Sequence, residues 1–149
     1  MEIKYYIPDI SDIRVGYECE TKVYPYPNWI KTKIEDGEDI EFIFSKQWEI
    51  RVPYLTKEQI ESEGWIVDNS MGKIEDNLLF NKKGKFREDD VNYKIYYVPK
   101  TKWLLIYLGD YLLRYTENKT ELTTNNTLFA GYCPSINEFR YITKNLLKI

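Results

Sequence analysis

Residues 55–64, LTKEQIESEG, carry the clearest local structural signal of the chain. Thr56 and Gln59 have the spacing of a capping box, in which each side chain accepts a hydrogen bond from the other residue's backbone N–H. The leucine before this pair and the isoleucine after it have the spacing of a hydrophobic staple. Gly64 suits the left-handed position that ends a helix. The sequence therefore predicts a short helix near residues 57–63.

Strand-like patterns precede this helix. Polar and apolar residues alternate along residues 13–20 and again along 48–52, which is the pattern of half-buried strands. Between them, Asp36-Gly37 separates two further strand-like runs, residues 29–35 and 38–45. Because Asp-Gly is a preferred hairpin turn, we expect these two runs to form a hairpin.

Strand patterns also follow the helix, and turn residues separate them. The tetrapeptide Asn-Lys-Lys-Gly at residues 81–84 predicts a turn. Further strands are predicted, in chain order, at residues 78–80, 85–86, 91–97, 103–108, 111–115 and 128–133.

The C-terminal residues change to a helical period. Ser135 and Glu138 have the spacing of a second capping box, and apolar residues then recur every three or four positions. This pattern predicts an amphipathic helix near residues 136–147. The expected fold is α+β: a single domain, residues 1–149, with a mostly antiparallel β-sheet of several hairpins and these two helices.

Composition excludes many kinds of chemistry. The chain has no histidine and two cysteines, which excludes Ser-His-Asp and Cys-His catalysis and histidine-ligated zinc. We expect no metal and no cofactor. The charged N-terminus is unlike a signal peptide, and no apolar run is long enough to span a membrane. A net charge of −3 makes a nucleic-acid partner a poor fit.

Several side chains are candidates for binding. Arg14, Arg51 and Tyr54, together with Gly16, have the chemistry to contact an anionic ligand: arginine forks onto phosphate or carboxylate and stacks on rings. On the predicted strand 13–20, Gly16 is where a ligand could lie against the backbone. The simpler interpretation places both arginines in cross-strand ion pairs.

A different class of function uses carboxylates. Glu18 and Glu20 lie two residues apart, so they share one face of the predicted strand. Such a pair could hold a metal ion and support hydrolysis. The simpler interpretation is a row of solvated acidic side chains.

Three stretches, residues 12–20 (DIRVGYECE), 52–65 (VPYLTKEQIESEGW) and 135–142 (SINEFRYI), carry a resemblance. Together they resemble a family of small uncharacterised proteins of phages and prophages of Bacteroidota. The resemblance implies a phage setting and brings no catalytic residues.

The expected function is therefore a non-catalytic, phage-encoded binding protein rather than an enzyme. It would act in the host cytoplasm and sequester or block a host target, such as an immune component or a signal nucleotide. The partner would be a host protein or an anionic small molecule. Two alternative functions stay open: a small metal-dependent hydrolase using Glu18 and Glu20, and a virion or structural component. A second copy of the chain stays open as a further partner, in a homo-oligomer.

Overall fold

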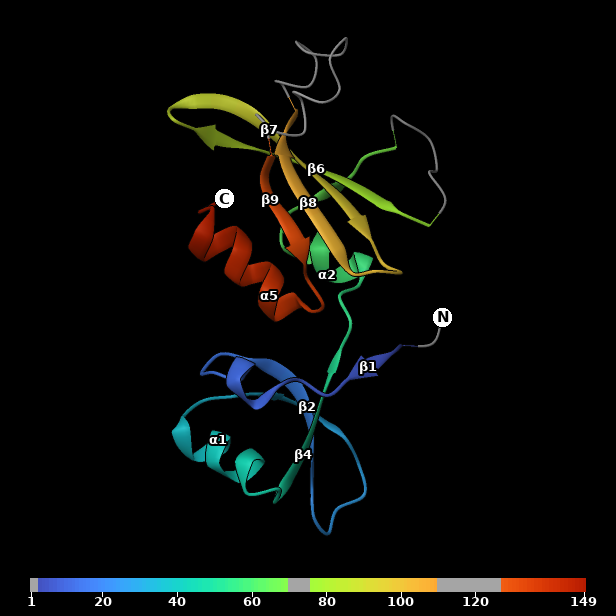
Figure 1. Ribbon diagram of the computed structural model, residues 1–149, viewed down its shortest axis with the longest axis vertical. Helices are drawn as coiled ribbons and strands as arrows, with labels where there is room; N and C mark the ends of the chain where they lie inside the picture. The colour runs from blue at the N-terminus through green and yellow to red at the C-terminus, as the bar shows by residue number, and fades with distance from the viewer. Residues whose placement is uncertain (1–2, 70–75, 110–126) are drawn as a thin grey trace. The chain divides into compact units, whose positions relative to one another are not determined.

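The computed structural model describes residues 3–69, 76–109 and 127–149 (Figure 1). The chain divides into two compact units, Met1–Tyr54 with Ser135–Asn137, and Leu55–Pro134 with Glu138–Ile149. The two units contain two antiparallel sheets and several short helices, which confirms the α+β class. A single domain over residues 1–149 stays a prediction.

The first unit is a four-stranded antiparallel sheet with the strand order β1-β4-β2-β3. A short 3-10 helix follows β1, and the helix α1 connects β3 to β4. The bounds are β1 Tyr5–Tyr6, η1 Ile10–Asp12, β2 Glu18–Val23, β3 Ile30–Lys33, α1 Gly37–Phe44 and β4 Trp48–Pro53.

One face of this sheet forms the core of the first unit. On β2, Cys19 and Thr21 are buried, while Glu18, Glu20 and Lys22 alternate to the other face. The buried cluster is Ile13, Tyr17, Cys19, Ile34, Ile43 and Val52. The charged residues of β2 and β4 therefore share the opposite, outward face.

The prediction of a strand over residues 13–20 is wrong in its first half. The strand begins only at Glu18, and a turn precedes it. Gly16 has φ +90° in this turn, a left-handed conformation that interrupts an extended run. Gly16 is thus a turn residue and not a mid-strand glycine, and Arg14 does not share a strand face with Glu18.

The predicted hairpin at Asp36-Gly37 is also wrong, because residues 38–45 are mostly helical. Asp36 is the N-cap of α1, and its Oδ1 accepts the backbone N–H of Asp39 at 3.1 Å. The phenyl ring of Phe42 then stacks on Trp48, with ring centroids 5.2 Å apart. Aspartate favours an N-cap as much as a turn, and the contact with β4 decides between them.

The second unit is a five-stranded antiparallel sheet with the order β5-β6-β7-β8-β9. Figure 1 labels the strands β6 to β9 of this sheet. The helix α2 precedes it, and the C-terminal helix continues as a π-helix. The bounds are α2 Lys57–Ser62, β5 Ile66–Val67, β6 Leu78–Phe86, β7 Asp89–Val98, β8 Trp103–Leu108, β9 Thr127–Tyr132, α5 Ile136–Arg140 and η2 Tyr141–Leu146.

Both predicted helices are confirmed. At α2, the backbone N–H of Thr56 donates to Gln59 Oε1 at 3.0 Å, and that of Gln59 donates to Thr56 Oγ1 at 3.2 Å. At α5, the hydroxyl of Ser135 accepts the backbone N–H of Asn137 at 3.1 Å. Phe139 of α5 is fully buried and packs edge-on against Trp65.

The predicted turn at residues 81–84 is wrong, because β6 runs straight through it. The chain turns instead at Arg87 and Glu88, which have φ of 51° and 73°. Gly84 serves packing: a Cβ there would lie 2.7 Å from Cε2 of Tyr93. The glycine therefore marks a close approach within the sheet and not its end.

The other strand predictions of the second unit fit the described residues. On β7, Val91, Tyr93, Ile95 and Tyr97 are buried in alternation. The predicted strand at residues 111–115 lies outside the described residues. Within the described parts of the chain, no helix has the length and apolar character needed to cross a membrane.

Candidate functional site

The outward face of the four-stranded sheet brings four charged residues together. The register pairs Glu20 with Arg51 and Lys22 with Glu49. Arg51 donates to Glu20 Oε1 from Nη2 at 2.7 Å and from Nε at 3.0 Å. The Nζ of Lys22 lies 3.1 Å from Glu49 Oε2. The two bonds to Glu20 fix the arginine in one orientation.

Two aromatic rings hold the same arginine. The guanidinium carbon of Arg51 lies 3.8 Å from the ring centroid of Tyr5 and 4.3 Å from that of Trp29. The Nζ of Lys22 is 5.1 Å from the Trp29 ring. We call Tyr5, Glu20, Trp29 and Arg51 the arginine stack. Cation–π contacts of this kind strengthen as the cation loses water, and the Arg51 side chain keeps only 28% of its exposure.

The electrostatics of the stack keep the Tyr5 phenol neutral. Loss of solvent, then the hydrogen bond to Glu20 and the charge of Glu20, raise the pKa of Tyr5, and the nearby Arg51 opposes this rise. A neutral phenol can donate to the Glu20 carboxylate, and so can the guanidinium. Glu20 is therefore the acceptor at the centre of the stack.

An exposed aromatic segment, residues 24–30, leads into β3. In residues 24–30, Tyr24 is 89% exposed, Tyr26 is 71% exposed and Ile30 is 57% exposed. Trp29, in the same segment, is half-buried against Arg51. The segment thus exposes two tyrosines and an isoleucine to solvent, and its tryptophan is the residue that contacts Arg51.

The predicted site residues occupy different places in the first unit. Arg51 lies near rings, as expected, but the rings are those of Tyr5 and Trp29. Tyr54 stacks instead on Tyr6, with ring centroids 4.9 Å apart. Its backbone N–H donates to the carbonyl of Lys4 at 3.0 Å. Tyr54 therefore packs beside β1. Its ring stacks on Tyr6, whereas its position in the sequence near Arg51 suggested a contact with that arginine.

Arg14 and Gly16 belong to a separate place from the arginine stack. Arg14 donates to the carbonyls of Asp12 at 3.2 Å and Asn137 at 3.3 Å. Its guanidinium carbon is 5.9 Å from the ring of Tyr17. Gly16 faces open space where a side chain would be. The two predicted arginines thus have different partners.

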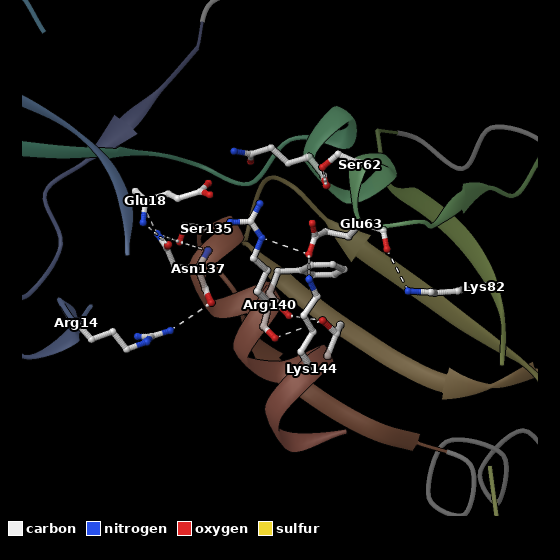
Figure 2. A network of polar contacts seen from close by, with 12 residues as sticks. Arg14, Glu18, Ser62, Glu63, Lys82, Ser135, Asn137, Arg140 and Lys144 are labelled. Carbon is white, nitrogen blue, oxygen red and sulfur yellow. Dashed lines mark hydrogen bonds and ion pairs between the residues drawn. The ribbon is translucent and has the colours of Figure 1, made fainter. Parts of the chain in front are cut away.

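The carboxylate pair shares one strand face, as predicted, but its members have different surroundings. Glu20 is bound by Arg51. The backbone of Glu18 is bound by the Asn137 side chain: its N–H donates to Oδ1 at 2.7 Å, and its carbonyl accepts from Nδ2 at 2.8 Å (Figure 2). Among residues 3–69, 76–109 and 127–149, no three acidic, cysteine or histidine residues form a metal-binding group.

A second polar cluster lies in the second unit (Figure 2). Glu63, at the end of α2, has its Oε1 3.3 Å from Arg140 Nε and 3.1 Å from Lys144 Nζ. Its backbone carbonyl accepts from Lys82 Nζ at 3.1 Å. The Glu63 side chain is only 11% exposed. This cluster fastens the C-terminal helix to α2 and β6.

Neither cysteine has the character of a nucleophile. Burial, helped by the charge of Glu20, raises the pKa of Cys19 to about 11. Burial, helped by the charge of Glu138, also raises the pKa of Cys133. Reactive cysteines instead have a lowered pKa and access to solvent. Both thiols therefore behave as small core residues.

Sequence reasoning missed Tyr5 and Trp29. Tyr5 contacts Arg51 only because β1 pairs with β4, a register that no local pattern gives. The composition of residues 24–30, YPYPNWI, was the available signal, since tyrosine and tryptophan beside prolines suit a binding segment.

Comparisons with protein-family models, with curated proteins and with solved structures each give no match.

Proposed function

We propose that the protein is a non-catalytic, phage-encoded binding protein that sequesters or blocks a host target through the outward face of its four-stranded sheet. The arginine stack beside the exposed aromatic segment carries this proposal. The phage setting rests on the family resemblance alone, which implies a target in the host cell.

The composition of this surface suits recognition of a protein. Tyrosine, tryptophan and arginine are the residues that most often dominate binding energy at protein interfaces. Here they come from separate elements, and ion pairs and ring contacts fix them before any partner arrives. Such a prearranged surface loses less side-chain entropy on binding. Tyr24 and Tyr26 add exposed area that a partner could cover.

A host protein suits this surface better than a signal nucleotide. Two donors of Arg51, Nε and Nη2, already bind Glu20. A phosphate on the remaining donors of Arg51 would lie next to the Glu20 carboxylate, whose side chain is only 16% exposed. Two anions so close together repel each other, most strongly where water is scarce. The same pairing disfavours the hydrolase alternative, because a carboxylate held by arginine is a weaker metal ligand.

Affinity capture from a lysate of a Bacteroidota host tests the proposal. The bait proteins are the wild type, the double variant Tyr24→Ser with Tyr26→Ser, and Tyr132→Ser as a matched control. Tyr132 is a 60% exposed tyrosine of the second unit. We expect the wild type and the control to retain one host protein in a fixed ratio, and the double variant to lose it.

Native mass spectrometry of the purified bait reports the competing outcome. A nucleotide bound to the wild type, with no host protein retained, would show that the target is a small anion and not a protein. Equal retention by all three baits would show that the aromatic segment is not the recognition surface.

A further inference from the structure

The strand β3 is the last strand at one edge of the four-stranded sheet. Its inner side pairs with β2, in a register that sets Thr32 opposite Cys19 and Ile30 opposite Thr21. An edge strand has backbone N–H and C=O groups on its outer side that no neighbour binds. The alternation of the ladder determines which residues these are.

The ladder turns the backbone of Lys31 and Lys33 outward. The Tyr17 carbonyl accepts the N–H of Ile34, directly after β3, at 2.9 Å, whereas the N–H and the carbonyl of Glu18 both bond to the Asn137 side chain. In an antiparallel ladder, neighbouring residues point their backbone groups to opposite sides. Cys19 and Thr21 therefore face β3, so Thr32 and Ile30 face β2, and the two lysines face the open edge.

Charge distinguishes the partners that this edge accepts. Lys31 and Lys33 are both exposed. Neither forms an ion pair or a side-chain hydrogen bond within the described parts of the chain. Pairing two copies edge to edge would bring lysines near lysines, a known protection against self-association. An acidic strand would find both charge partners and backbone partners here.

We propose that β3 accepts an extended acidic segment of the partner protein as a fifth strand. This inference rests on the proposed function, and it names the chemistry of the partner. Backbone hydrogen bonds to Lys31 and Lys33 would supply affinity, and acidic side chains at alternate positions of the segment would pair with the two ammonium groups. Ile30, 57% exposed at the start of β3, would contact an apolar residue of the added strand.

Hydrogen exchange with a synthetic peptide tests the added strand. The probe is acetyl-Thr-Glu-Val-Glu-Val-Glu-Thr-amide, and the same peptide with lysine for glutamate is its control. The amides of Lys31 and Lys33 are the reporters, and the inward amide of Thr32 is the internal reference. At a free peptide concentration about ten times Kd, both reporters should exchange about tenfold more slowly.

Charge reversal provides the second arm. The variant Lys31→Glu with Lys33→Glu should prefer the lysine peptide, whereas Lys83→Glu with Lys85→Glu, on β6, should keep the preference of the wild type. Equal protection by both peptides in the wild type, or none at millimolar peptide, would overturn the inference. Protection that rises with protein concentration alone would assign the edge to a second copy and also overturn it.

This result is independent of the capture experiment. Loss of the host protein in the Tyr24 and Tyr26 variant, with no peptide protection at β3, would keep the proposed function and remove the edge inference. Peptide protection at β3, with equal capture by all baits, would keep the edge inference and remove the proposed function.

Discussion

Replacing Asn137 by aspartate tests how the strand β2 is completed. The Asn137 amide accepts from the Glu18 N–H at 2.7 Å and donates to the Glu18 carbonyl at 2.8 Å. Since Glu20 pairs with Arg51, the residue of β4 opposite Glu18 would be Pro53, which has no N–H to donate. The asparagine side chain therefore stands in for a backbone partner that proline cannot provide.

The cost of the change follows from these two bonds. Asn137→Asp keeps the acceptor but replaces the donor by an oxygen that faces the Glu18 carbonyl. Asn137 is 5% exposed, so losing the bond and leaving a carbonyl unsatisfied should lower the free energy of unfolding by about 2–4 kcal/mol at pH 7. Asn137→Ala removes both bonds and should cost a similar amount at every pH.

The aspartate variant should depend on pH in a known direction. Burial and the facing carbonyl favour the protonated acid, so its pKa in the folded protein should rise above the unfolded value of about 3.9. Its stability is then kept below pH 4 and lost as the pH rises through the raised pKa. Relative to the wild type, Asn137→Asp should therefore lose less at pH 4 than at pH 7.

Urea unfolding at the two pH values, with hydrogen exchange of the Glu18 amide as a local measure, checks this reasoning. Both variants should speed exchange of that amide, and Asn137→Ala the more. An equal loss at pH 4 and pH 7 for Asn137→Asp, or wild-type exchange at Glu18 in Asn137→Ala, would refute the role given to the amide.

Four further predictions concern single features of the fold. Thr56→Ala removes a helix cap and should lower the free energy of urea unfolding by about 1 kcal/mol. Phe139→Ala empties a fully buried site and should cost about 3–5 kcal/mol; an unchanged thermal midpoint would contradict its packing. Arg87→Asn with Glu88→Gly relieves two positive φ angles and should add about 1–2 kcal/mol; a lower midpoint would contradict the turn. The pKa of Cys19, raised from 9.0 to about 11, predicts slow alkylation by iodoacetamide at pH 8 and a stability that falls as pH rises from about 9 toward 11.

Local signals in the sequence predict the helices correctly, because the residues that begin each helix lie within a few positions of one another. The capping box of Thr56 and Gln59 needs only its own turn of chain, and the structure reproduces both hydrogen bonds. Asp36 shows the limit of such signals. The same side chain can begin a helix or make a hairpin turn, and the stacking of Phe42 on Trp48 selects the helix.

The β6–β7 turn was misplaced for a related reason. Gly84 reads as a turn residue, yet its missing side chain makes room for the ring of Tyr93. The true turn at Arg87 and Glu88 has neither glycine nor asparagine, so its sequence has no turn signal. Packing across strands, which sequence patterns do not show, settled both positions.

The candidate site was only half accessible to sequence reasoning. Arg51 stood out by its chemistry, and its pairing with Glu20 fits the simpler interpretation that arginines form cross-strand ion pairs. Its rings come from segments more than 20 residues away in sequence. Only the strand order brings Tyr5 to Arg51, and only the return of the chain into β3 brings Trp29 there.

Residues 137–144 also bear on the order in which the protein can fold during synthesis. Asn137 completes β2 in the first unit, and Arg140 with Lys144 neutralises the nearly buried Glu63 in the second. The ribosome adds these residues long after Glu18 and Glu63, so a nascent chain shorter than residue 137 has an unfinished strand and a carboxylate without these cations. Both units therefore wait for the same short stretch of chain before they reach their final hydrogen bonding.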